Sequence, residues 1–155
     1  MVGRLKKNRR GAATVEMAIV LPLLLMLSLG AIRYGWLFLK AQQITNAARY
    51  GARIAIRTDA TAAEVIAAID ALFDVTRANI TGYTVKFFRT DIDAGTGAQI
   101  LTEINDISAE VGVPITVEVT VPHENVDIVP VPFVTELEPE NWNLGASATM
   151  TKEGF

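Results

Sequence analysis

The sequence predicts an α+β fold, in which a long N-terminal helix, membrane-spanning in its first half, packs on a small antiparallel sheet domain. Two observations predict this fold class. Good helix formers dominate residues 12–57, where Pro22 is the only proline. Segments that alternate apolar and polar residues come later, between residues 83 and 152. Helices that precede the strands, and do not alternate with them, favour an antiparallel sheet.

The first half of the long helix has the composition of a membrane span. Residues 17–32 form a stretch of 16 residues without a charged side chain. As a helix this stretch spans about 24 Å, and apolar residues on both sides extend it to the roughly 30 Å of a bilayer core. We therefore expect residues 12–39 to form a transmembrane and assembly helix. Arg33, Tyr34 and Trp36 are expected at the outer membrane interface, where snorkelling basic side chains and aromatic rings are favoured.

The charge of the chain changes sign after its first residues. Residues 1–11 hold five basic side chains and no acidic one, whereas the rest of the chain holds nine basic and 17 acidic side chains. The positive-inside rule then keeps the N-terminus in the cytoplasm and exports residues 40–155 as an extracytoplasmic α+β domain. The acidic character of that domain also argues against a nucleic-acid partner, because phosphate contacts need a basic face.

Three kinds of N-terminal segment fit this pattern: an ordinary secretory signal peptide, a permanent membrane anchor, and a prepilin leader that is cut before the apolar segment. Glu16 favours the prepilin leader. A carboxylate at the centre of a membrane helix costs about 2.5–3.5 kcal/mol, and neither a signal peptide nor an anchor gains anything from it. Cleavage between Gly11 and Ala12 would remove residues 1–11 as a basic leader peptide and place an α-ammonium group one helical turn from Glu16. In a bundle of parallel helices, that ammonium group can pair with the carboxylate of a neighbouring subunit.

Two segments of the chain carry a family resemblance. The first reads RRGAATVEMA at residues 9–18 and continues with LPLL at residues 21–24, and the second reads QQITNAARYGAR at residues 42–53. Both resemble TadE-like proteins, which are minor pseudopilins of the Flp (tight adherence, Tad) pilus system. The resemblance covers residues 9–57. The chain departs from the family at Met17, where an aromatic residue is more usual.

The resemblance implies a pilin-like fold and a function in assembly. It implies cleavage after Gly11 by a prepilin peptidase, with Glu16 as the glutamate of the family. It also implies a single-pass protein of the bacterial inner membrane, whose partners are the prepilin peptidase, the pilus assembly platform and other pilin or pseudopilin subunits. We expect a role in pilus biogenesis, and hence in adhesion or biofilm formation, with incorporation into a surface pilus. No cofactor and no enzymatic activity are expected.

The helix is expected to continue beyond the membrane to about residue 57, a length of roughly 70 Å. Pro22 removes one backbone hydrogen bond, so a break there is the alternative to the kink that membrane helices tolerate. Beyond the membrane, apolar and mostly small residues recur at spacings of three and four: Leu37, Ala41, Ile44, Ala48, Ala52 and Ala55. Such a face packs closely, either against the protein's own domain or against another subunit.

Arg49, Arg53 and Arg57 form a row of like charges at successive i, i+4 positions of the same helix. Like charges at this spacing destabilise an isolated helix by about 0.2–0.5 kcal/mol per pair. Two interpretations remain open: a solvated face that pairs with acidic side chains of the same chain, and a contact with the acidic surface of a neighbouring subunit. Together with Glu16 and Pro22, these arginines are the candidate assembly residues.

The exported domain is expected to contain a second helix and three strands. Thr61 and Glu64 form the pattern of a capping box, which predicts a helix over residues 61–74. A turn-rich loop is expected at residues 91–97, and residues 126–133 are expected to be an edge strand or an extended connection because they contain two prolines. The expected strands are residues 83–88, 115–121 and 146–152.

Composition argues against several kinds of catalytic site. The chain has no cysteine and one histidine, His123, which removes thiol catalysis, zinc–thiolate sites and histidine metal clusters. The loop at residues 91–97 lacks the third acidic ligand and the distal glutamate of a calcium loop, so a hairpin or surface loop is expected there. The glutamates at 136, 138 and 140 are expected in a solvated loop, and His123 at a turn. We therefore predict no catalytic residue and no metal site.

Two functions other than a pilus subunit remain open. The main alternative is a membrane-anchored extracytoplasmic binding domain that does not assemble, and a more distant one is a secreted hydrolase with an ordinary signal peptide. The N-terminus of the mature protein distinguishes them. It is Ala12 for the pilus subunit, Met1 for the anchored domain, and a residue near Ala31 for the secreted protein.

Overall fold

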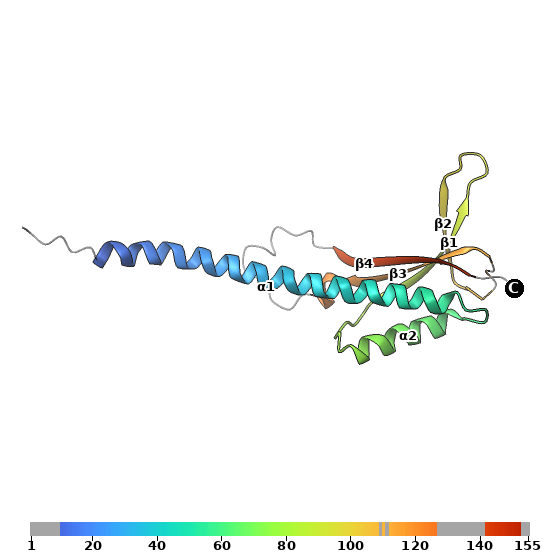
Figure 1. Ribbon diagram of the computed structural model, residues 1–155, viewed down its shortest axis with the longest axis horizontal. Helices are drawn as coiled ribbons and strands as arrows, with labels where there is room; N and C mark the ends of the chain where they lie inside the picture. The colour runs from blue at the N-terminus through green and yellow to red at the C-terminus, as the bar shows by residue number, and fades with distance from the viewer. Residues whose placement is uncertain (1–9, 109, 111, 127–141, 153–155) are drawn as a thin grey trace, which may run out of the picture.

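The structure is a computed structural model, which describes residues 10–108, 110, 112–126 and 142–152. Its elements are α1 (Arg10–Ala55), α2 (Ala62–Val75), β1 (Thr84–Ile92), β2 (Gln99–Ile104), β3 (Pro114–Pro122), the short 3₁₀-helix η1 (His123–Asn125) and β4 (Asn143–Thr151). In Figure 1, α1 forms the long axis of the molecule. Its N-terminal half extends alone, and its C-terminal half packs against α2, β3 and β4. The expected α+β class, with a long helix packed on an antiparallel sheet, is confirmed.

The helix α1 is continuous over 46 residues and is therefore about 70 Å long. Pro22 lies inside it without ending it, so the expected continuation through Pro22 is confirmed and the break does not occur. The helix ends at Ala55, two residues before the expected end. The backbone tightens there, because Arg57 N–H donates to the Ile54 carbonyl and Ala60 N–H donates to the Arg57 carbonyl.

The second helix, α2, forms for the reason that the sequence indicates. The Thr61 side chain accepts a hydrogen bond from Glu64 N–H at 3.3 Å, and the Glu64 carboxylate accepts one from Thr61 N–H at 3.2 Å, which is a complete capping box. Val65, Ile69 and Phe73 are its buried residues. They hold α2 against α1. The expected helix over residues 61–74 is confirmed within one residue.

The four strands form one antiparallel sheet in the order β2-β1-β3-β4. The strands expected at residues 83–88, 115–121 and 146–152 correspond to β1, β3 and β4. The strand β2 was not expected, because the sequence QILTEI does not alternate apolar and polar residues; all of its side chains except the half-buried Ile104 are exposed. The strand β1 also extends to Ile92, beyond the expected end at residue 88.

The core lies between the sheet and the C-terminal half of α1. Alternate residues of β3 point toward the helix and are fully buried: Ile115, Val117, Val119 and Val121. The buried residues on α1 include Ile44, Ala48, Ala52 and Ala55, as the spacing predicts, while Leu37 and Ala41 are half-buried. The small-residue face of α1 therefore packs under the protein's own domain.

Two segments singled out in the sequence lie mostly outside the described residues. Of the extended connection expected at residues 126–133, the structure describes only Val126, which caps η1. The acidic stretch that contains the glutamates at 136, 138 and 140 is not among the described residues at all.

Candidate functional site

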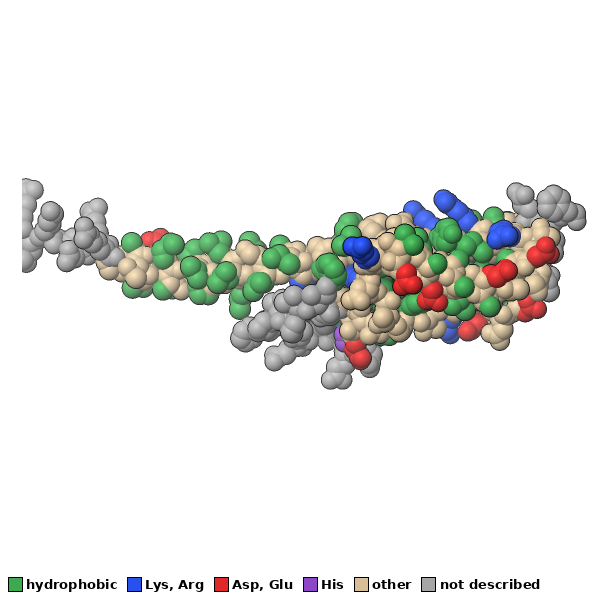
Figure 2. Space-filling view, turned by 90° about the horizontal axis from the view of Figure 1, so that it is seen from below, with side chains coloured by type: hydrophobic (Ala, Val, Ile, Leu, Met, Phe, Trp, Pro, Cys, Tyr) green, Lys and Arg blue, Asp and Glu red, His purple; other side chains and the backbone are tan. Residues whose placement is uncertain are grey.

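The N-terminal part of α1 is an apolar helix that the rest of the protein does not cover, and we call residues 13–32 the free rod. Every residue of the free rod is exposed except Gly30, which is half-buried. Its 20 residues are about 30 Å long as a helix, which equals the thickness of a bilayer core. Among the described helices, α1 alone has the length and apolar composition that a membrane span requires. Figure 2 shows the rod as a narrow helix covered with hydrophobic side chains.

Glu16 lies near the start of the free rod and is exposed. It is one helical turn from Ala12, whose backbone belongs to the first turns of α1. The chain contains no lysine or arginine between Arg10 and Arg33, so no basic side chain of the free rod can pair with this carboxylate. A cationic partner for Glu16 within a membrane must therefore come from outside the rod. Gly11 is also exposed, and a Cβ atom added there would meet no atom within 4 Å.

The folded part of the described chain, from Arg33 onward, is called the body. The three residues expected at the membrane interface lie where the free rod meets the body. Arg33 is only 3% exposed, so protein covers its side chain, which does not extend freely along the helix. Trp36 Nε1 donates a hydrogen bond to the Val126 carbonyl at 3.2 Å, whereas Tyr34 is 60% exposed. Arg33 and Trp36 thus mark the boundary between the free rod and the body, six residues before the expected end of the span at residue 39.

Lys40 strengthens the same boundary. Its Nζ atom donates to the Ala78 carbonyl and lies 4.9 Å from the centroid of the Trp36 ring, which is a cation–π distance. The side chain is 3% exposed. No local sequence pattern predicts this contact, because Ala78 is 38 residues away along the chain.

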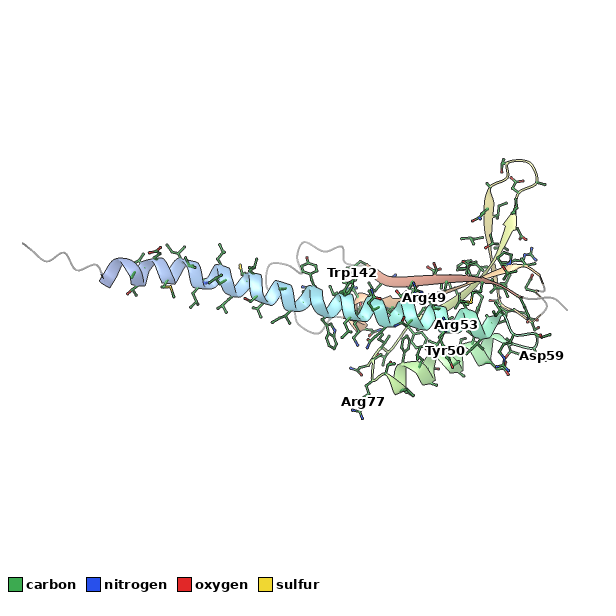
Figure 3. The ribbon with its side chains drawn as sticks, in the orientation of Figure 1. Arg49, Tyr50, Arg53, Asp59, Arg77 and Trp142 are labelled. Carbon is green, nitrogen blue, oxygen red and sulfur yellow. The ribbon has the colours of Figure 1, made fainter. Side chains whose placement is uncertain are left out.

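The three arginines of the row are exposed. Arg49 and Arg53 lie on α1, whereas Arg57 lies in the turn after the helix ends at Ala55, so the expected helical row is one residue shorter. Figure 3 shows Arg49 and Arg53 on the part of the helix that packs on the body. The ion pairs between described residues join Lys86 to Glu103 and Arg89 to Asp91 and Glu110, and none involves the row. Of the two interpretations, pairing with acidic side chains of the same chain is therefore not found in the part that the structure describes.

An apolar groove lies beside this row, between α1 and α2. It has a volume of about 310 Å³ and is lined by Tyr50, Ala68, Ala71, Leu72 and Val75. We call these five residues the α1–α2 groove. Val75 is 82% exposed and Tyr50 42%. The groove was missed from the sequence, although Ala68, Ala71, Leu72 and Val75 recur at helical spacing on a second side of α2.

The hairpin of β1 and β2 projects from the body (Figure 1), and its outer part, residues 91–101, is called the arm. The Asp93 carboxylate accepts hydrogen bonds from Gly95 N–H at 3.0 Å and from the Thr96 hydroxyl at 2.7 Å. These bonds lower the pKa of Asp93, because they stabilise the carboxylate. The hairpin expected at residues 91–97 is thus confirmed. In the described residues no group of three potential ligands could hold a metal ion.

The arm carries large apolar side chains that nothing covers. Ile92, Ile100 and Leu101 are 73%, 48% and 58% exposed. Ile92 and Leu101 lie on one face of the hairpin, because Thr90 pairs with Leu101 and alternate residues of a strand share a face. Ile100 lies on the other face. Sequence reasoning missed this surface because it did not predict β2.

His123 lies in η1, at the turn where the sequence places it. Its ring stacks on that of Trp142 with 5.6 Å between the centroids, and its backbone N–H donates to the Trp142 carbonyl at 3.3 Å. These contacts join the end of β3 to the start of β4. They give His123 a structural role in packing.

Comparisons with known proteins bear on the N-terminal part of the chain. No curated protein and no solved structure matches the chain. A family model does match, from Gly11, the residue before the expected cleavage point, to Arg53 in the arginine row. The matched segment contains the whole free rod and the start of the body. Residues 11–53 match the model of the TadE-like protein family, which confirms the resemblance and supports a Tad pilus-associated protein with one helix suited to span a membrane.

Proposed function

We propose that this protein is a minor pilin or pseudopilin subunit of a Tad/Flp-type pilus, is processed by a prepilin peptidase and assembles through its N-terminal helix. The observation that carries the proposal is the free rod, an apolar helix of bilayer length with a carboxylate at its start. Its function is structural and not enzymatic. Its partners are the prepilin peptidase, the pilus assembly platform and other pilin-like subunits.

The exposed apolar surface of the free rod provides the driving force for assembly in this proposal. Apolar surface is unfavourable in water by about 25 cal/mol per Å², so the rod is stable only in lipid or against other helices. When such a helix leaves the membrane, neighbouring rods are the apolar surface that replaces lipid. A parallel bundle of rods also brings the new N-terminus at Ala12 close to Glu16 of a neighbour, which offsets the cost of the buried carboxylate.

The orientation of the body follows from the charge distribution. The basic residues before Gly11 keep the N-terminus in the cytoplasm, and the acidic body is then extracytoplasmic. In an assembled pilus the rods form the centre and the bodies form the outer surface. That surface supports adhesion and biofilm formation in this proposal.

The mature N-terminus tests the proposal directly. The full chain is expressed together with a prepilin peptidase, and the mature protein is sequenced from its N-terminus. We expect it to start at Ala12. An intact Met1 supports the anchored binding domain instead, and a start near Ala31 supports a secreted protein.

A matched pair of glycine variants separates processing from folding. A Cβ atom at Gly11 or at Gly30 meets no atom within 4 Å, so we expect both Gly11→Leu and Gly30→Leu to leave the fold unchanged. We expect Gly11→Leu to block cleavage, because the side chain changes the residue at the cut bond, and Gly30→Leu to be cleaved normally. Normal cleavage of the Gly11→Leu protein would contradict processing at this bond.

A further inference from the structure

The arm is built to hold its apolar residues away from the body. Asp93 N–H donates to the Ala98 carbonyl at 2.9 Å, and Gly97 N–H donates to the Asp93 carbonyl at 2.8 Å, so the tip is a hydrogen-bonded turn. The arm presents Ile92 and Leu101 on one face. Exposed apolar residues on a projecting, ordered element mark an interaction surface more often than scattered single ones do.

The α1–α2 groove has the complementary shape and chemistry. It is concave and its lining is apolar apart from the Tyr50 hydroxyl. Arg49 and Arg53, which flank Tyr50 along α1, add positive charge to the α1 side of the groove (Figure 3). The arm adds negative charge at its tip through Asp93, whose carboxylate is held by the turn and forms no ion pair in the described part of the chain.

The positions of the two surfaces suit contact between parallel copies. In Figure 1 the arm rises from one side of the body near the C-terminal end of α1, and α2 runs back along the other side from that end. A neighbour with the same orientation, shifted along the long axis, can therefore offer its groove to the arm. Because the two surfaces differ, the contact is head-to-tail and can repeat from copy to copy.

We propose that the arm of one copy docks in the α1–α2 groove of a second copy of this chain, with Leu101 and Ile92 against Leu72 and Val75. The inference rests on the proposed function, because the rods hold neighbouring bodies at a high effective concentration, at which a small contact is occupied. It adds a contact between bodies that the rods alone do not provide. The acidic tip and the arginines favour this register over others.

Disulfide crosslinking of the full chain in membranes tests the contact, and the absence of native cysteine makes the reading unambiguous. The test chain carries Leu101→Cys with Val75→Cys, one on the arm and one in the groove. The control chain carries Leu101→Cys with Ile66→Cys, because Ile66 is an exposed apolar residue of α2 that does not line the groove. A third chain carries only Leu23→Cys and reports contact between rods.

We expect the test chain to give a ladder of dimers, trimers and longer species, with about tenfold more product than the control. A ladder arises because each copy carries both halves of a head-to-tail contact. Equal product from test and control, dimers alone, or no product overturns the arm–groove contact. The Leu23→Cys chain shows whether assembly itself has failed: rod dimers without arm–groove product leave the proposed function intact.

A charge exchange tests the register of the same contact. Ala94 is exposed at the tip of the arm, so Ala94→Lys places a cation opposite the arginines and should lower the Leu101–Val75 product severalfold. Adding Arg53→Glu to that chain should restore the product. Failure of the second change to restore it contradicts the proposed register.

Discussion

The helices α1 and α2 approach each other closely at Gly51. A Cβ atom added there would lie 2.9 Å from Ile69 Cδ1 and 3.3 Å from Val65 Cγ1, so there is no space for a side chain. Both neighbours are fully buried, and their movement would disturb the core. The close approach, and not backbone conformation, explains the glycine at this position.

Gly51→Leu is therefore expected to destabilise the body by about 1–3 kcal/mol, the usual cost of overpacking a core. Gly35→Leu is the matched control, because a Cβ atom at Gly35 meets no atom within 4 Å. Denaturant unfolding of the detergent-solubilised protein, followed by tryptophan fluorescence, measures the difference. Equal stability of the two variants would contradict the packing of α2 on α1.

The ionised carboxylate of Asp93 stabilises the turn at the tip of the arm. The hydrogen bonds from Gly95 and Thr96 lower the pKa of Asp93 in the folded protein. Their contribution to stability is complete above the ordinary aspartate pKa of about 3.9 and is lost as the pH falls through the lowered folded value. We expect the amide signal of Gly95 to titrate with a midpoint below 3.9 in an NMR experiment. In Asp93→Asn this titration should be absent, and a midpoint above the ordinary value would contradict the assigned hydrogen bonds.

The helix α1 works as two elements joined at Arg33. The residues of its free rod are exposed apart from the half-buried Gly30, whereas its second part supplies one wall of the core. The same regular backbone serves both because the residues differ: large apolar side chains cover the rod, and alanines and Gly51 line the buried face.

A charge in the middle of the rod should weaken its insertion. Leu23→Lys places a cation at the centre of residues 13–32, where it costs about 2.5–3.5 kcal/mol. Gln42→Lys adds the same charge at an exposed position of the second part. We expect Leu23→Lys to reduce the fraction that resists carbonate extraction from membranes, while Gln42→Lys leaves it unchanged. The opposite result would place the membrane-spanning segment elsewhere on α1.

At the scale of the whole molecule, the buried core that stabilises the fold lies in the body, whereas the proposed assembly uses the exposed rod. We propose that the arginine row takes part in assembly, because none of its members forms an ion pair within the described chain. Reversal of one of its charges should then change contacts between molecules and not the fold.

We expect Arg53→Glu to impair assembly into pili by several-fold, measured as the amount of sheared surface filament, and to change the free energy of unfolding by less than about 0.5 kcal/mol. The change also removes the i, i+4 like-charge repulsion with Arg49 in α1, which is slightly stabilising. If Arg53→Glu lowers assembly and stability equally, the arginine row instead contributes to contacts within its own chain.

The sequence by itself determined the long helix, the capped second helix, and the strands β1, β3 and β4. These depend on local signals: unbroken helix formers, the Thr61–Glu64 capping box, and alternation beside a buried face. The apolar span, and the unusual carboxylate of Glu16 near its start, can also be recognised from the sequence, because the free energy of transfer into lipid is a property of each residue.

Only the tertiary structure decided where the body meets the rod, which strands are neighbours, and that β2 exists. The Trp36–Val126 and Lys40–Ala78 contacts join residues 90 and 38 positions apart, a separation that no local pattern encodes. The strand β2 has no buried face of its own and is held by backbone hydrogen bonds to β1. The arm and the groove arise from these long-range choices, because each is formed where two elements meet.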